Sequence, residues 1–207
     1  MRKQNLAVLI TFLALLGSLV YVGINREKVG IAIPSSTDSP EIQDVILHSY
    51  AVYRGALRNG GDVSEFDNVF INTTDYHYEN QDVRDFVSLV LGPEIANVGG
   101  YLTVMKAKYI AYGCSVRSFE DIELAAKKED RNVTSDEIKS IQEKCYGVLP
   151  PRISEGAPPK LDFEKIDITG DRAVAQYDDG AALLEAILVR ENGRWLIAKI
   201  EPIEIHY

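Results

Sequence analysis

The stretch from residue 161 to residue 201 reads LDFEKIDITGDRAVAQYDDGAALLEAILVRENGRWLIAKIE and decides the fold class. Apolar and polar residues alternate along it: Leu196 and Ala198 share one face of the last predicted strand, whereas Lys199 and Glu201 share the other. Asp-Gly and Asn-Gly pairs supply the positive φ angles that tight hairpins need. The predicted strands are 161–168, 172–177, 181–190 and 195–201, with turns at 169–171, 178–180 and 191–193. The pattern predicts an antiparallel meander with one covered face.

A helix is predicted ahead of this meander, over residues 40–58. Ser39 is typical of an N-cap and Pro40 of a first helical position, and apolar residues then recur at three- and four-residue steps. Asn59-Gly60-Gly61 predicts the end of this helix. Helices before a sheet make the expected fold class α+β.

The middle of the chain is predicted to be mostly helical. Residues 62–81 read as a loop with a short apolar island at Val69-Phe70-Ile71. Residues 100–112 favour a helix, although their β-branched and aromatic content leaves a strand as an alternative. Thr134 and Glu137 have the spacing of a capping box. Predicted helices are 82–91, 100–112, 118–128 and 134–146, the last two of them exposed at the surface.

The N-terminal segment predicts a membrane anchor. Residues 6–24 are apolar or weakly polar, and a helix of that length matches the thickness of a hydrocarbon core. Arg2 and Lys3 favour a cytoplasmic N-terminus, which places the following domain outside the cytoplasm. The expected organisation is an anchor at 1–28, a linker at 29–39 and an extracytoplasmic domain at 40–207.

Signal cleavage is the alternative to an anchor. A cleaved signal peptide has a shorter apolar region that ends in small residues, whereas Tyr21-Val22-Gly23 places a bulky ring near the candidate site. The anchor is therefore preferred, and the expected localisation is a single-pass membrane protein with a secreted protein as the alternative. Both alternatives export the domain.

Charge excludes one class of partner. The formal net charge of the chain is −9. Residues 1–28 have a net charge of +3, so the remaining residues have a net charge of −12. An acidic body repels phosphate backbones, so no nucleic acid is expected as a partner. The expected partners are the lipid bilayer, through residues 6–24, and either a protein or a small hydrophobic ligand.

The chain has two cysteines, Cys114 and Cys145, and their expected redox state depends on the cellular compartment. No CxxC pair or Cys/His cluster accompanies them, and three scattered histidines lack metal-ligand spacing, so no metal is expected. Outside the reducing cytoplasm a disulfide is the natural interpretation, and two separate buried thiols are the alternative.

A resemblance to a known superfamily follows from the end of the chain. Residues 168–174, ITGDRAV, and 188–198, LVRENGRWLIA, resemble the paired late strands of the nuclear transport factor 2-like superfamily, which includes ketosteroid isomerase-like domains. The resemblance implies a curved sheet that forms a cone around the helix at 40–58, with residues 94–160 as a helical insertion. It also implies that Tyr50, Tyr53 and Trp195 line a pocket; filling the core is their alternative role.

Candidate chemistry is sparse. Asp75-Tyr76-His77-Tyr78 gathers a carboxylate, an imidazole and two phenols, so Asp75 and His77 are further pocket candidates. No nucleophile elbow, phosphate-binding loop or dinucleotide fingerprint occurs, so no cofactor is expected and the catalytic residues are unknown. The preferred hypothesis is a binding or assembly domain. A small-molecule isomerase, cyclase or hydrolase of the ketosteroid isomerase-like type is the alternative.

Overall fold

The structure is a computed structural model, and it describes residues 38–150 and 159–206. These residues form an α+β fold with one four-stranded antiparallel sheet, which confirms the fold class at this level. The helices are α2 (Ser39–Arg58), η2 (Ser64–Asn68), α3 (Gln81–Leu91), α4 (Pro93–Val98), α5 (Tyr101–Lys128) and α6 (Ser135–Lys144). The strands are β1 (Asp162–Thr169), β2 (Arg172–Asp178), β3 (Ala182–Glu191) and β4 (Arg194–Ile205).

The described residues fall into two compact units. The first, the sheet unit, contains the start of α2 up to Leu47 together with most of the sheet. The second, the helical unit, contains residues 48–150 together with 196–198 of β4. Helix α2 and strand β4 therefore each contribute to both units.

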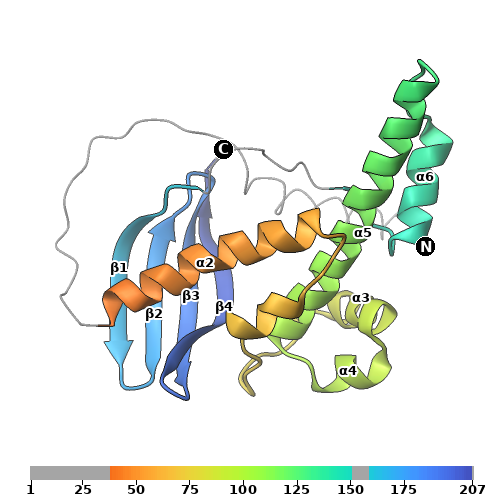
Figure 1. The fold of residues 1–207 in the computed structure, drawn as a ribbon. Helices are drawn as coiled ribbons and strands as arrows, with labels where there is room; N and C mark the ends of the chain where they lie inside the picture. The colour runs from red at the N-terminus through yellow and green to blue at the C-terminus, as the bar shows by residue number, and fades with distance from the viewer. Residues whose placement is uncertain (1–37, 151–158, 207) are drawn as a thin grey trace. The chain divides into compact units, whose positions relative to one another are not determined.

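The sheet is a meander in the order β1-β2-β3-β4 (Figure 1). Thr169 pairs with Arg172 across the first turn. Asn192 and Gly193, with φ angles of 51° and 77°, form the turn between β3 and β4. Two positive φ angles in succession are what an Asn-Gly hairpin turn requires. The four strands and three turns thus agree with the sequence prediction, with strand ends that differ by at most four residues.

Burial along β2 and β3 follows the pleat. Every second residue is buried in β2 and, as far as Leu188, in β3, and several of these positions carry small side chains, such as Ala173, Ala175 and Ala186. Residues 195–198 of β4 are instead all buried. In the same unit, Ile42 and Ile46 on the first half of α2 have no exposed surface. Apolar burial on this scale is the main favourable term for the unit.

An ion pair holds the beginning of α2 in the sheet unit. The helix begins at Ser39, one residue earlier than predicted, and the Asp38 carboxylate accepts a hydrogen bond of 2.5 Å from Arg190 on β3. The Arg190 guanidinium also lies 4.7 Å from the centre of the Trp195 ring, within the range of a cation–π contact. Trp195 is only 1% exposed, so its ring fills the interior of this unit.

The helical unit is built around α5, which differs from the prediction. Residues 101–128 form one continuous helix, whereas the sequence predicted separate helices at 100–112 and 118–128. The predicted break contains Gly113, a poor residue for a helix interior. Gly113 is nevertheless helical, and its missing side chain leaves room for Gly60 and Gly61 to lie against the helix backbone. Helix α3 contacts both α4 and α5.

The apolar island at 69–71 joins the helical unit to one strand segment. Phe70 forms a parallel bridge with Ile197, with backbone hydrogen bonds of 2.8 and 3.0 Å on either side. Asn72, just after it, accepts hydrogen bonds from the backbone amides of Gly100 and Thr103 and so caps the start of α5. The predicted loop therefore positions the longest helix.

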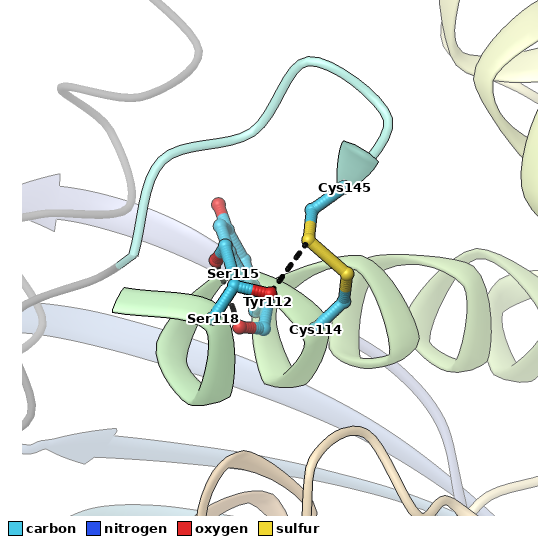
Figure 2. Close-up of a disulfide and its surroundings, with 5 residues drawn as sticks. All are labelled: Tyr112, Cys114, Ser115, Ser118 and Cys145. Atoms are coloured by element: carbon cyan, nitrogen blue, oxygen red, sulfur yellow. Dashed lines mark hydrogen bonds between the residues drawn. A yellow bond between two sulfur atoms is a disulfide. The ribbon is translucent and has the colours of Figure 1, made fainter. Parts of the chain in front are cut away.

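Cys114 and Cys145 form a disulfide between α5 and the end of α6 (Figure 2). Their Cα atoms are 5.6 Å apart, an ordinary separation for a disulfide. Cys145 has no exposed surface, and its sulfur lies 3.7 Å from the hydroxyl oxygen of the buried Ser118. Residues 118–128 and α6, predicted to be exposed, are thus partly buried where the two helices meet.

The turn before α6 contains the predicted capping box, and it makes this turn sensitive to acid. The Glu137 carboxylate accepts hydrogen bonds from Arg131 and Thr134, which lower its pKa to about 2. Because the pKa is depressed in the folded state, this stabilisation is complete above the ordinary pKa of 4.5 and is lost as the pH falls towards 2. We expect the Glu137 carboxyl carbon to titrate near pH 2 by NMR and, in Arg131→Gln, at higher pH. An unchanged midpoint in the variant would contradict this assignment.

Several predictions concern residues that the structure does not describe. The anchor at 6–24, its orientation and most of the linker at 29–39 lie outside the described residues. In the described part of the chain no helix is long and apolar enough to cross a membrane.

Candidate functional site

Nine aromatic rings form one connected network in the helical unit, and this network is the candidate site. Each ring lies within 6.3 Å of a neighbouring ring, measured between centroids. The rings come from α2, η2, α5 and the segment between η2 and α3. They are Tyr50, Tyr53, Phe66, Phe70, Tyr76, Tyr78, Tyr101, Tyr109 and Tyr112.

Tyr53 lies at the centre of the network. Its ring stacks on Tyr109 at 4.7 Å with an angle of 6° between the planes, and on Phe70 at 5.3 Å and 19°. Phe66 meets Tyr53 edge-on at 5.9 Å. Offset-stacked and edge-on arrangements are the favourable ones for aromatic pairs. The centre of the network is therefore a packed core.

Exposure to solvent varies among the nine rings of the network. Phe66, Phe70 and Tyr112 are buried, whereas the remaining six tyrosines are only half-buried. Tyrosines are enriched at binding surfaces. The six half-buried residues, here called the tyrosine face, are Tyr50, Tyr53, Tyr76, Tyr78, Tyr101 and Tyr109.

The phenols of the network are hydrogen-bond donors at neutral pH. Burial raises the pKa of Tyr76 to about 12, with a further contribution from the charge of Glu79. Burial also raises the pKa of Tyr112 to about 12, and that of Tyr109 more strongly. All three hydroxyls keep their protons, so they present O–H groups and no negative charge.

Lys108 places a cation beside the tyrosine face. Its ammonium nitrogen lies 6.0 Å from the centre of the Tyr109 ring, and the residue as a whole is half-buried. Burial lowers the pKa of this ammonium to about 8, and the negative charge of Glu79 opposes the shift. Near neutral pH Lys108 can therefore bind an anion as a cation or, as a neutral amine, accept a proton or attack a carbonyl.

Lys108 should react with acylating reagents at lower pH than an ordinary lysine. At pH 8 about half of its amine is neutral, against less than 1% for a lysine of pKa about 10.4. Lys106, two residues away, is a matched reference because its ammonium is 2.6 Å from Asp67. Limited acetylation with an activated ester, followed by peptide mass spectrometry, should modify Lys108 at least about fivefold faster than Lys106 at pH 8. Equal rates would contradict the lowered pKa.

The residues predicted as pocket candidates separate into three groups. Tyr50 and Tyr53 both belong to the ring network, 6.3 Å apart. Asp75 and His77 are exposed, on either side of Tyr76, whose ring is part of the network. Trp195 is in the sheet unit, where it packs against Arg190.

Lys108 and Tyr101 are two of the site residues that the sequence did not single out. Both are on α5, seven positions apart and hence on one face of the helix. That spacing was readable from the sequence, but a lysine at helical spacing from a tyrosine is common on surfaces. Only the approach of residues 66–79 to this face makes Lys108 distinctive.

Within residues 38–150 and 159–206, no three His, Cys, Asp or Glu side chains are placed to hold an ion.

Comparison with known proteins adds no assignment, because no protein-family model, curated protein or solved structure matches this chain.

Proposed function

We propose that this chain is a membrane-tethered binding or assembly domain, located outside the cytoplasm, whose binding surface is the tyrosine face. The observation that carries the proposal is the gathering of six half-buried tyrosines and Lys108 in one unit. Tyrosines supply large contact area at low conformational cost and are enriched in binding surfaces. Scattered surface tyrosines would not form one connected network of rings.

The disulfide supports the proposed localisation. Structural disulfides persist in oxidising compartments and are rare in the cytoplasm. A disulfide between Cys114 and Cys145 therefore fits a domain that residues 6–24 hold on the outer side of a membrane. Secretion after signal cleavage is the alternative, and it would also place the domain in an oxidising compartment.

Thiol trapping in cells tests the localisation. Acid quenching followed by alkylation should find no free thiol in the full-length chain, whereas a variant without residues 1–28 should stay inside and carry two. N-terminal sequencing of the mature chain then separates an anchor from a cleaved signal. Two free thiols in the full-length chain would overturn the proposal of an extracytoplasmic domain.

The nuclear transport factor 2-like superfamily remains the proposed fold family. The resemblance of residues 168–174 and 188–198 supports it, as does the order of one helix, a helical region and a final meander. In that family the curved sheet forms a cone with an open end that can hold a small molecule, and residues 94–160 would be an insertion. An experimental structure that shows a flat sheet would reject the assignment.

Native mass spectrometry tests the binding function. The full-length chain, extracted from membranes of its own host in mild detergent, should carry a bound mass that is lost in Tyr50→Ala. Tyr50 contacts the network through Tyr53 alone among the described rings, so its removal should leave the packed centre intact. Leu124→Ala, at an exposed position of α5, is the control and should retain the mass. Loss from both variants, or from neither, would argue against the tyrosine face.

An enzyme of the ketosteroid isomerase-like type is the second candidate, and Lys108 is the observation that favours it. A general base works best when its pKa is close to the operating pH, and the pKa of Lys108 is about 8. The conversion of 3-cyclohexenone to its conjugated isomer, followed by ultraviolet absorbance, probes proton abstraction next to a carbonyl. Turnover by the wild type that disappears in Lys108→Gln would favour the enzyme. Equal rates in the wild type and in Lys108→Gln would leave binding as the proposed function.

A further inference from the structure

The chain contains two triplets of the kind that accepts N-linked glycans, and the structure distinguishes them. The acceptor pattern is Asn-X-Ser or Asn-X-Thr, in which X is not proline. It occurs at residues 72–74, Asn-Thr-Thr, and at residues 132–134, Asn-Val-Thr. The first triplet lies between η2 and α3, and the second lies in the turn between α5 and α6. Because an attached saccharide is bulky and hydrophilic, the asparagine that carries it must project from the surface.

The carboxamide of Asn72 is already used by the fold. Its oxygen accepts hydrogen bonds from the backbone amides of Gly100 at 3.1 Å and Thr103 at 3.2 Å, and its nitrogen donates one to the Thr103 hydroxyl at 3.0 Å. Thr103 is buried, and a Cβ atom at residue 100 would lie 2.8 Å from the Asn72 oxygen. Although Asn72 as a whole residue is exposed, a sugar on its nitrogen would compete for this space. Attachment there would therefore disturb the start of α5.

The carboxamide of Asn132 has no such role. The residue is exposed, and within the described part of the chain its side chain makes no hydrogen bond. Its backbone carbonyl accepts a hydrogen bond from the Arg131 guanidinium at 3.1 Å, so the turn is held without help from the Asn132 side chain. A sugar on the Asn132 nitrogen would thus break no contact of the folded helical unit.

The turn that contains Asn132 is remote from the part of α5 that contributes to the tyrosine face. It joins α5 to α6 at the end of the helix pair that lies away from α3 and α4 (Figure 1). Nineteen residues separate Tyr109 from Lys128, the last residue of α5, which corresponds to about 29 Å along the helix at 1.5 Å per residue. A saccharide at Asn132 is therefore compatible with binding at Tyr109 and its neighbours.

We propose that Asn132 carries an N-linked glycan and that Asn72 stays unmodified. The donor is a saccharide joined through phosphate to a membrane lipid. The Asn132 Nδ2 atom forms a bond to the anomeric carbon of the sugar, and the bond between that carbon and the phosphate oxygen breaks. The nitrogen loses one proton, the lipid phosphate leaves with the electron pair, and nothing is oxidised or reduced. The inference rests on the proposed extracytoplasmic location, because such triplets are used in exported chains.

Glycopeptide mass spectrometry tests the inference on the full-length chain isolated from membranes of its own host. Trypsin cleaves after lysine and arginine and so releases the two asparagines in separate peptides, residues 59–84 and 132–139. Peptide 132–139 should carry a saccharide mass, whereas peptide 59–84 should be unmodified. Finding peptide 132–139 only in its unmodified form, or finding the saccharide on peptide 59–84, would overturn the inference.

Three variants test whether attachment depends on the second triplet. Asn132→Gln removes the acceptor and should abolish the saccharide mass, whereas Thr134→Ser keeps the hydroxyl that both the triplet and the capping box require and should retain it. Thr74→Ala is the matched control, because it destroys the first triplet without removing any hydrogen bond of Asn72. It should leave the saccharide mass unchanged. A saccharide that persists in Asn132→Gln, or that is lost in Thr74→Ala, would contradict the assignment.

Failure of the glycan and failure of the proposed location give different results. A full-length chain without free thiols whose Asn132 is unmodified would exclude the glycan and leave the extracytoplasmic location in place. Two free thiols would overturn the location and, with it, the inference.

Discussion

Gly113→Ala is expected to destabilise the protein by about 3 kcal/mol or more, since overpacking commonly costs 1–3 kcal/mol and here the obstacle is backbone. A Cβ atom at residue 113 would lie 1.9 Å from the Gly61 nitrogen and 2.3 Å from the Gly61 Cα atom. Backbone cannot move aside as the end of a side chain can, so α5 and the 60–61 segment would have to separate. Urea unfolding followed by circular dichroism measures the loss.

Gly55→Ala is the matched control for this prediction. Gly55 also lies inside a helix, but a Cβ atom there would meet nothing within 4 Å. Because alanine is the better helix former, this substitution should stabilise the protein by up to about 1 kcal/mol. The two substitutions are chemically identical and should have opposite signs. A Gly113→Ala variant within about 0.5 kcal/mol of the wild type, the usual range for a surface substitution, would contradict the close approach.

Loss of the disulfide is expected to cost roughly 3–4 kcal/mol on the chain-entropy model, because the bridge closes a loop of 31 residues. The double variant Cys114→Ala/Cys145→Ala removes the bridge without leaving a polar group at the buried Cys145 position. Its urea midpoint should fall well below that of the oxidised wild type. Alanine is preferable to serine here, since a buried hydroxyl without a partner would add its own penalty.

Reductant provides the control for the disulfide. Reduced wild type should unfold near the midpoint of the double variant, and reductant should have no effect on the double variant itself. Coincident midpoints for oxidised and reduced wild type would mean that the bridge does not constrain the unfolded chain. A change in the slope of the denaturant dependence would instead indicate a change in the unfolded state.

Local signals explain which elements were predictable. The Asn192-Gly193 turn, the Thr134–Glu137 capping box and the end of α2 at Arg58 depend on a few neighbouring residues, and the structure contains all three. The continuity of α5 across Gly113 was missed, because glycine is locally unfavourable inside a helix and the Gly61 backbone that packs against it is more than fifty residues away in the sequence.

The candidate site likewise combines residues that the sequence singled out with residues that only the structure brings together. Tyr50 and Tyr53 were selected by their positions on the first helix, and the structure places both in the ring network. Their partners, Phe70 and Tyr109, come from distant segments and could not be paired with them by spacing. Lys108 gained its lowered pKa from burial, which is a property of the packed unit.

The sequence alone determined the alternation of the four strands, the helical period before them and the acidic balance of the chain, because each depends on neighbouring residues or on composition. The tertiary structure decided that Gly113 lies inside a helix, that Cys114 meets Cys145, and that Tyr109, stacked on Tyr53 from another helix, lies beside Lys108. Burial and close approach between distant segments are properties of the packed chain, so no local pattern encodes them.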